Sequence, residues 1–149
     1  MNLQPDRQLV DRCYQLALQG YGEGGIPVGS LLAQDGEILA EGWNRRVQLG
    51  DPIAHGEMDC LRRAGRRRSY RDTVLYTSLS PCMMCAGTLV QFGIPALVIL
   101  ENRNFGGYED FLRASGVAVT IVDDERCIHL MARFIAERPE LWNEDIGEG

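Results

Sequence analysis

The sequence contains no lysine, and all 15 of its basic residues are arginines. A Schiff-base lysine and the lysine of a P-loop are therefore excluded as functional groups. Acidic residues outnumber basic ones by 21 to 15, which gives a formal net charge of −6 at pH 7. A chain with this balance is poorly suited to hold a phosphate backbone, so we expect no nucleic-acid partner.

Long apolar runs are also missing, and the first residues, MNLQPDRQ, contain no hydrophobic signal core. The five cysteines are an odd number, which disfavours a disulfide framework. These features predict a cytoplasmic protein with reduced thiols and no membrane partner. A length of 149 residues suits one compact unit, so we expect residues 1–149 to form a single domain.

One stretch departs from the acidic character of the chain, because six arginines lie close together at Arg62, Arg63, Arg66, Arg67, Arg68 and Arg71. The favoured interpretation is a solvated helix end, where cations complement the helix dipole. The alternative is a nucleic-acid patch, which the acidic remainder of the chain argues against.

The predicted elements run from a helix through a hairpin to strands that alternate with helices. Two apolar runs flank the turn dipeptide Asp35-Gly36, which predicts a hairpin over 28–42. The other predicted segments are helices from Asp6 to Gly20, over 54–64, from Pro81 to Phe92, over 108–114 and from Asp123 or Asp124 to Pro139, and strands over 73–79, 96–100 and 117–122. This order predicts an α/β fold with a mixed sheet, parallel in its second half and covered by helices on both faces.

The pair Cys82 and Cys85 leaves three alternatives: a disulfide, a redox pair, or two ligands of a metal. Residues three apart share one face of a helix, and the start of a helix favours thiolates. Two thiolates with one imidazole are typical zinc ligands. A redox pair would need a thioredoxin-like context, which this segment lacks. The metal is therefore the favoured interpretation.

His55 is the candidate imidazole, and Glu57 follows two residues later. The two side chains can serve one site only at the irregular entry of a helix, which the sequence permits. We expect the remaining thiols and imidazole outside the site, namely Cys13, Cys60, Cys127 and His129. Three ligands leave the fourth position of a catalytic zinc for water, and H-x-E…P-C-x-x-C is the pattern of zinc deaminases.

Beyond this motif, the sequence resembles the fungal-type cytosine deaminases of the cytidine deaminase-like superfamily. The resemblance runs from about Tyr21 to Gly149 and is carried by GYGEGGIPVG, AHGE, LYTSLSPCMMC, GIPALVILENRNF, IVDDERC and FIAERPELWNEDIGE. It implies a three-layer α/β/α sandwich with a mixed five-stranded sheet, a homodimer and one catalytic Zn²⁺ per subunit. It also implies hydrolytic deamination of cytosine to uracil and ammonia in pyrimidine salvage, by a zinc-activated water with Glu57 as proton shuttle.

The resemblance also implies a role for each matching residue. It assigns His55, Cys82 and Cys85 to zinc. For substrate binding, it places Asn44 and the Gly56 N–H at the base carbonyl, the Ser80 carbonyl at the departing amine, and Asp145 at a ring N–H. It places Phe105 and Trp142 against the ring, and Val28 and Asn143 in the pocket wall. The chain departs from the family pattern at Val28, Met83 and Asn143, and we expect Asn143 to enlarge or re-polarise the pocket.

Three other functions stay open at this point. The first is deamination of another small amino-heterocycle, such as isocytosine, creatinine, a pterin or a guanine-like base. The second is a nucleoside or tRNA deaminase, which the acidic charge disfavours. The third is a zinc-stabilised binding module, which the open fourth ligand position disfavours.

Overall fold

The computed structural model describes residues 4–149. In chain order its elements are α1 (Arg7–Gly22), β1 (Gly29–Gln34), β2 (Glu37–Trp43), α2 (Arg46–Leu49), α3 (Gly56–Ala64), β3 (Val74–Thr77), α4 (Met83–Phe92), β4 (Ala96–Ile99), α5 (Glu109–Ala114), β5 (Ala118–Ile121), α6 (Glu125–Glu137) and α7 (Pro139–Asp145).

The five strands form one mixed sheet in the order β2-β1-β3-β4-β5. β1 pairs antiparallel with both β2 and β3, whereas β3, β4 and β5 are parallel. Asp35 and Gly36 both have positive φ angles, of 52° and 80°, as the tight turn between β1 and β2 requires. The predicted hairpin and the parallel second half of the sheet are thus confirmed.

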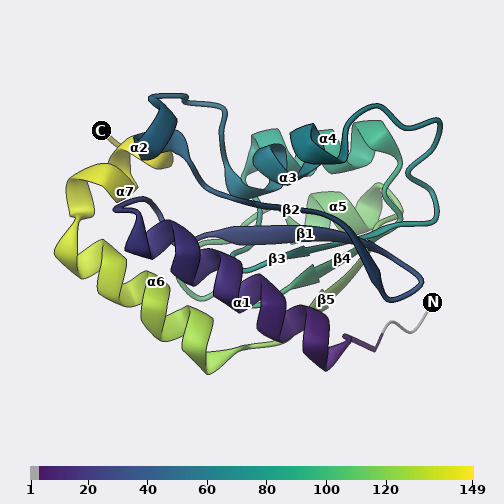
Figure 1. Cartoon of the computed structure of the whole chain (residues 1–149), viewed down its shortest axis with the longest axis horizontal. Coiled ribbons are helices and arrows are strands. Elements are labelled where there is room, and N and C mark those ends of the chain that lie inside the picture. The colour runs from purple at the N-terminus through teal and green to yellow at the C-terminus, as the bar shows by residue number, and fades with distance from the viewer. Residues whose placement is uncertain (1–3) are drawn as a thin grey trace.

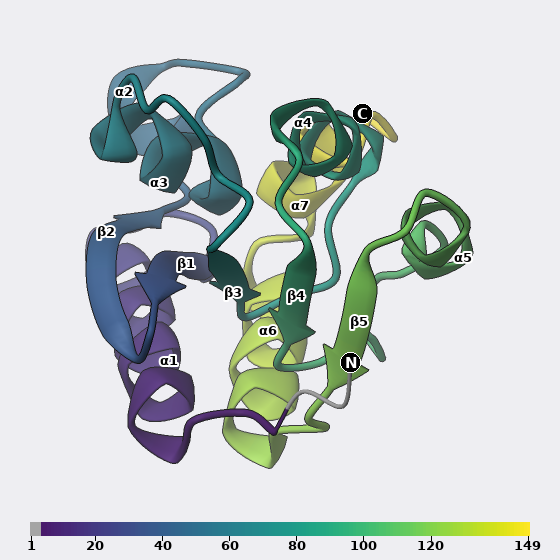
Figure 2. The same cartoon turned by 90° about the vertical axis from the view of Figure 1, so that its right-hand side faces the viewer.

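Helices cover both faces of the sheet, α1 and α6 on one side and α3, α4 and α5 on the other (Figures 1 and 2). Successive residues of each strand point to opposite faces, so each strand serves two cores. In β1, for example, Leu31 packs with Leu16 on the α1 side, and Leu32 packs with Leu61 on the α3 side. The three-layer α/β/α sandwich is confirmed.

Two predicted caps act as expected. The side chain of Asp6 accepts a hydrogen bond from Gln8 N at the start of α1. The side chain of Asp124, rather than that of Asp123, accepts from the backbone N–H groups at the start of α6. The first helix runs to Gly22 instead of ending at Gly20, because the chain reverses only at Gly24, whose φ angle is +85°.

One prediction at a helix start is wrong. Pro81 is not the first helical residue, because Cys82 is the N-cap of α4 and the helix begins at Met83. The helix α6 ends before Pro139 as expected, but Pro139 also starts a further helix, α7, which was not predicted. The short helix α2 was also not predicted; it lies beside α7, where Arg46 pairs with Glu144 at 3.2 Å (Figure 1).

The arginine cluster forms a helix end only in part. Arg62 and Arg63 lie in the last turn of α3, but the other four follow in the loop to β3. Three of those four are exposed, and the guanidinium of Arg67 lies 5.6 Å from the ring centre of Tyr70. Among the described residues, no helix is long and apolar enough to cross a bilayer.

Candidate metal centre and cavity

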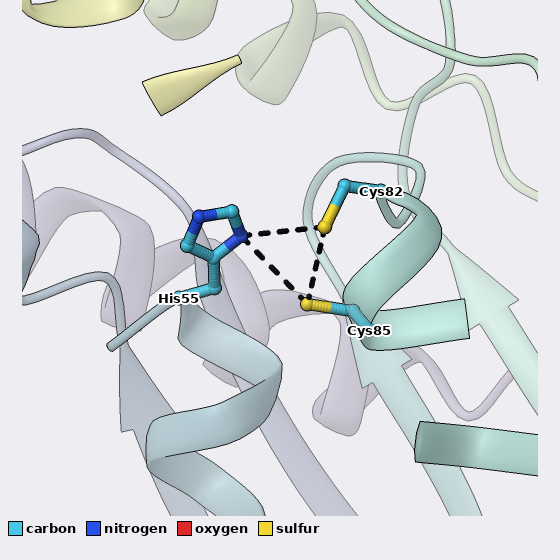
Figure 3. A group of neighbouring side chains, drawn as sticks. All are labelled: His55, Cys82 and Cys85. Carbon is cyan, nitrogen blue, oxygen red and sulfur yellow. Dashed lines mark hydrogen bonds between the residues drawn. The ribbon is translucent and has the colours of Figure 1, made fainter. Parts of the chain in front are cut away.

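Two helix starts on one side of the sheet bring three metal-ligand side chains together (Figure 3). His55 is the N-cap of α3, Cys82 is the N-cap of α4, and Cys85 lies in the first turn of α4. His55 Nδ1 lies 3.5 Å from Cys82 Sγ and 3.8 Å from Cys85 Sγ, and the two sulfur atoms are 3.7 Å apart. All five cysteines are free, so the pair Cys82 and Cys85 is not a disulfide.

These separations fit a tetrahedral zinc ion. Zn–S bonds of about 2.3 Å and Zn–N bonds of about 2.0 Å place two sulfur ligands about 3.8 Å apart, and a sulfur and a nitrogen about 3.5 Å apart. The observed distances between the three donor atoms agree with both values to within a few tenths of an ångström. Two sulfurs and one imidazole nitrogen are also the ligand types that zinc prefers, and three ligands leave a position free for water.

The three donors share protons in a way that prepares them for a cation. The hydrogen bond from Cys85 stabilises a thiolate at Cys82 and lowers the pKa of Cys82 to about 4, while the same contact raises the pKa of Cys85. Burial opposes a charge on His55, but hydrogen bonds to Asp145 and Cys82 outweigh it and raise the pKa of His55 to about 10. A bound zinc would displace these protons, because its ligands are thiolates and neutral imidazole.

Asp145 holds the outer side of the imidazole. Its Oδ1 lies 3.2 Å from His55 Nε2 and accepts a hydrogen bond from Asn44 Nδ2, also at 3.2 Å. Asn44 is almost fully buried, and its own Oδ1 accepts from the backbone N–H of Arg46. A carboxylate on the distal nitrogen of a ligand histidine fixes the tautomer that presents Nδ1 to the metal.

Glu57 follows in the first turn of α3 and is only 3% exposed. Burial, aided by the nearby charge of Cys82, raises the pKa of Glu57 to about 7. A carboxyl group with a pKa close to neutrality can both take up and release a proton under physiological conditions. Glu57 also lines the cavity described next, where its carboxyl group can meet a bound molecule.

A small cavity opens beside these groups. The part of it that the centre of a water-sized sphere can occupy measures about 30 Å³. Its lining combines the polar groups above with apolar side chains; the lining residues are Val28, Asn44, His55, Glu57, Leu79, Ser80, Cys82, Phe105, Trp142, Asp145 and Ile146. The cavity can therefore offer a small molecule both polar and apolar contacts.

Aromatic side chains from two distant segments close the cavity. Phe105, on the β4–α5 loop, meets Trp142 of α7 edge-on, with ring centres 6.0 Å apart and ring planes at 88°. Such an edge-to-face pair is a favourable arrangement of aromatic rings. Trp142 is 7% exposed and packs with Val28 and Phe134 in a third apolar cluster at this end of the sheet.

The structure brings most of the predicted site residues to this cavity. Gly56 begins α3 beside it, and a Cβ there would come within 2.9 Å of Val28 O, so only glycine allows this approach. Asn143 is the exception: its side chain is exposed and does not line the cavity, because the turn of α7 that directs Trp142 and Asp145 inwards directs Asn143 to solvent. Ile146 occupies the wall instead.

Sequence reasoning missed Leu79 and Ile146 as lining residues. Each lies next to or near a predicted site residue, but neither carries a chemical group that would single it out. The residues set aside as structural are indeed remote from the metal cluster: Cys13, Cys60 and Cys127 are buried in the cores, and the side chain of His129 is 78% exposed.

Comparison with known proteins agrees with this geometry. Residues 3–101 match the family model described as "Cytidine and deoxycytidylate deaminase zinc-binding region". A cytosine deaminase of Candida albicans is 47% identical over 146 residues, which cover 96% of this chain and 97% of that protein. A tRNA-specific adenosine deaminase of Haemophilus influenzae is 33% identical over 148 residues, covering 91% of this chain and 86% of that one.

Solved structures share the fold. The structure of a guanine deaminase from Bacillus subtilis is 29% identical in sequence and matches with a TM-score of 0.62, covering 76% of this chain and 72% of that one. That of a guanine deaminase from Nitrosomonas europaea matches with a TM-score of 0.78 over 91% of this chain and 87% of that one, at 22% identity.

Proposed function

The chain belongs to the zinc-binding cytidine and deoxycytidylate deaminase family, and we propose on this premise that it hydrolyses cytosine to uracil and ammonia. The observation that carries the proposal is the 47% identity to a cytosine deaminase, which extends over nearly the full length of both chains. Because the match covers 96% of this chain, it extends into the C-terminal segment that closes the cavity.

The cavity supports a free base as the substrate. The cavity is small, and α7 covers it with Trp142, Asp145 and Ile146. A ribose or a polynucleotide attached to the ring would have to pass through this cover. The net charge of −6 also disfavours a nucleic-acid substrate.

We assign His55, Cys82 and Cys85 as the protein ligands of the zinc ion. When bound there, zinc acts as a Lewis acid that makes a water molecule nucleophilic near neutral pH. Glu57 is the group that moves protons: it takes one from the water and delivers it to ring N3 while the water oxygen bonds to C4. It then takes the second proton from that oxygen and delivers it to the exocyclic nitrogen, whose bond to C4 breaks as ammonia leaves. The sum is cytosine plus water giving uracil plus ammonia.

Other residues hold the base in place for this transfer. Asn44 and the N–H of Gly56 bind the ring carbonyl, and the Ser80 carbonyl receives the amine. Asp145 Oδ1 is already committed to His55 and Asn44, so we assign its other oxygen to a ring N–H. Phe105 and Trp142 pack against the faces and edge of the ring, as their place in the cavity wall allows.

Assembly and location complete the proposal. We expect a homodimer, which is the assembly that the resemblance to fungal-type cytosine deaminases implies. We expect residues 1–149 to act as one domain in the cytoplasm, where the five free thiols would stay reduced. Light scattering behind size-exclusion chromatography tests the assembly.

A substrate panel tests the function. Purified, zinc-loaded protein is given cytosine, cytidine, isocytosine, creatinine, guanine and an adenosine-bearing tRNA stem-loop, and ammonia release is measured. The proposal expects cytosine to have the highest kcat/KM. A higher kcat/KM for guanine would favour the activity named for the two structural relatives, and deamination of the stem-loop would favour the activity of the tRNA-specific relative.

A further inference from the structure

Glu109 does not line the cavity, yet its carboxylate joins two loops that do. It is the first residue of α5. Ser80 Oγ donates a hydrogen bond to one carboxylate oxygen of Glu109, and Asn102 Nδ2 donates to the other at 3.3 Å. Ser80 belongs to the loop that leads into Cys82, and Asn102 to the β4–α5 loop that carries Phe105.

The first of these loops depends on Ser80 for its position. Ser80 is 3% exposed, and its backbone N–H donates to Glu101 O at 3.0 Å. Main chain and side chain of Ser80 are therefore both held by groups outside the β3–α4 loop. Because only Pro81 separates Ser80 from the metal-ligand candidate Cys82, a shift of Ser80 is transmitted to the metal centre.

The second loop is folded around two carboxylates. The fully buried side chain of Glu101 accepts hydrogen bonds from the backbone N–H groups of Arg103 and Asn104, at 2.7 and 3.1 Å. On the other side of the loop, a Cβ at Gly106 would lie 3.3 Å from a Glu109 carboxylate oxygen. Phe105 lies between Asn104, which Glu101 anchors, and Gly106, which passes close to Glu109, and its ring meets that of Trp142 edge-on.

We propose that Glu109 is a positioning residue of the active site, which fixes the Ser80 carbonyl and the Phe105 ring relative to each other. It touches neither metal nor substrate in this account and acts through the hydrogen bonds from Ser80 and Asn102. The effect of Glu109 on the rate of deamination rests on the function proposed above, but its effect on the positions of Ser80 and Phe105 does not.

The positioning role of Glu109 must be separated from a simpler effect of its charge at the start of α5. Acidic residues in the first turn of a helix are favourable because they complement the helix dipole. Asp110 lies in the same turn, carries the same charge and is exposed. Asp110→Ala is therefore the matched control, since it alters the charge at the helix start without touching Ser80 or Asn102.

The first test needs no activity. In a Trp43→Phe background, Trp142 is the remaining tryptophan, and acrylamide quenching reports how well Phe105 covers it. Glu109→Ala should raise the quenching constant of Trp142, and so should Ser80→Ala, which leaves α5 intact. Asp110→Ala should leave it unchanged. Equal quenching in all four proteins would overturn the proposal.

The second test is a double-mutant cycle on cytosine deamination. Glu109→Ala and Ser80→Ala should each lower kcat/KM by about tenfold or more, because small misplacements of reacting groups are costly. The double variant should lose no more than Glu109→Ala alone, since that variant already lacks the hydrogen bond from Ser80. Zinc content should stay at the wild-type level, and Glu109→Gln, which can still accept from Ser80, should restore part of the activity.

The outcomes separate the two proposals. A wild-type protein inactive on cytosine would overturn the proposed function, while the quenching constants would still decide the role of Glu109. An active wild type with an equally active Glu109→Ala would overturn the positioning role alone. Losses that multiply in the double variant would also contradict it, because they would show that the two residues act separately.

Discussion

Asp145 Oδ1 lies 3.2 Å from Nε2 of His55, so a residue of the last helix supports a side chain of the metal cluster. The contact links α7 to the start of α3, two segments that lie far apart in the sequence. The helix that closes the cavity therefore also orients a metal ligand, and its loss should affect metal binding as well as substrate binding.

Asp145→Ala tests this link. Removal of the carboxylate behind a ligand histidine typically weakens metal affinity by about 10- to 100-fold. We expect a loss of that size, measured by competition with a chromophoric chelator. Glu144→Ala is the control, because Glu144 lies in the same helix and pairs only with Arg46 at the surface. Equal zinc affinities for the two variants would show that Asp145 does not support His55.

Glu57→Gln should abolish turnover without loss of metal. The amide keeps the shape of the side chain but cannot carry protons, and general acid–base groups contribute about 10²- to 10⁴-fold to rate. We expect a fall in kcat of at least that order with one zinc still bound, as measured by ammonia release and metal analysis. An active Glu57→Gln protein would require another proton carrier.

Substitutions at Trp142 and Asn143 should differ sharply in their effect on KM, although the two residues are adjacent in the sequence. Trp142 is buried in the cavity wall, whereas Asn143 is exposed. Trp142→Ala should raise KM for cytosine by about tenfold or more, because a large aromatic contact to the ring is lost. Asn143→Ala should leave both kcat and KM unchanged. A changed substrate preference in Asn143→Ala would restore the expectation that Asn143 tunes the pocket.

Asp124 should make the stability of the fold depend on pH. Burial alone would raise the pKa of Asp124, but hydrogen bonds from Arg126 and the start of α6 outweigh it and lower the pKa. A lowered pKa means that the ionised side chain stabilises the folded state above the unfolded pKa of about 3.9, and that this contribution is lost as pH falls through the folded value.

We therefore expect Asp124→Asn to be less stable than wild type at pH 7, by about 1 kcal/mol. The difference should shrink to nothing below the folded pKa. Urea unfolding at a series of pH values measures it. Asp123→Asn is the control: Asp123 is largely exposed, and asparagine tolerates its φ angle of 60°. A gap between Asp124→Asn and wild type that does not change with pH would contradict the ionic origin.

The sequence predicted the sheet and the metal cluster because both depend on local patterns. The turn dipeptide at Asp35-Gly36 and the spacing of Cys82 and Cys85 each carry their meaning within a few residues. The predicted helix at 54–64 likewise placed His55 and Glu57 at its entry, where the structure has them. For each of these features, one short segment contains both the residue types and the spacing that identify it.

The wall of the cavity was harder to predict, because it is set by long-range packing. Trp142 and Asn143 are adjacent in the sequence, and only the helical conformation of the tail decides which one faces inwards. No helix was predicted for the tail after Pro139, so the inward direction of Ile146 could not be inferred. The role of Glu109 could not be predicted from the sequence either, because two separate loops bring its partners Ser80 and Asn102 to it.

The most direct test of the whole account is the conversion of cytosine to uracil by the zinc-loaded protein, followed by chromatography of the products. We predict equimolar uracil and ammonia, no activity after removal of the metal by a chelator, and recovery on addition of Zn²⁺. Cytosine left unchanged by a folded protein that holds one zinc per chain would contradict the assignment of its substrate.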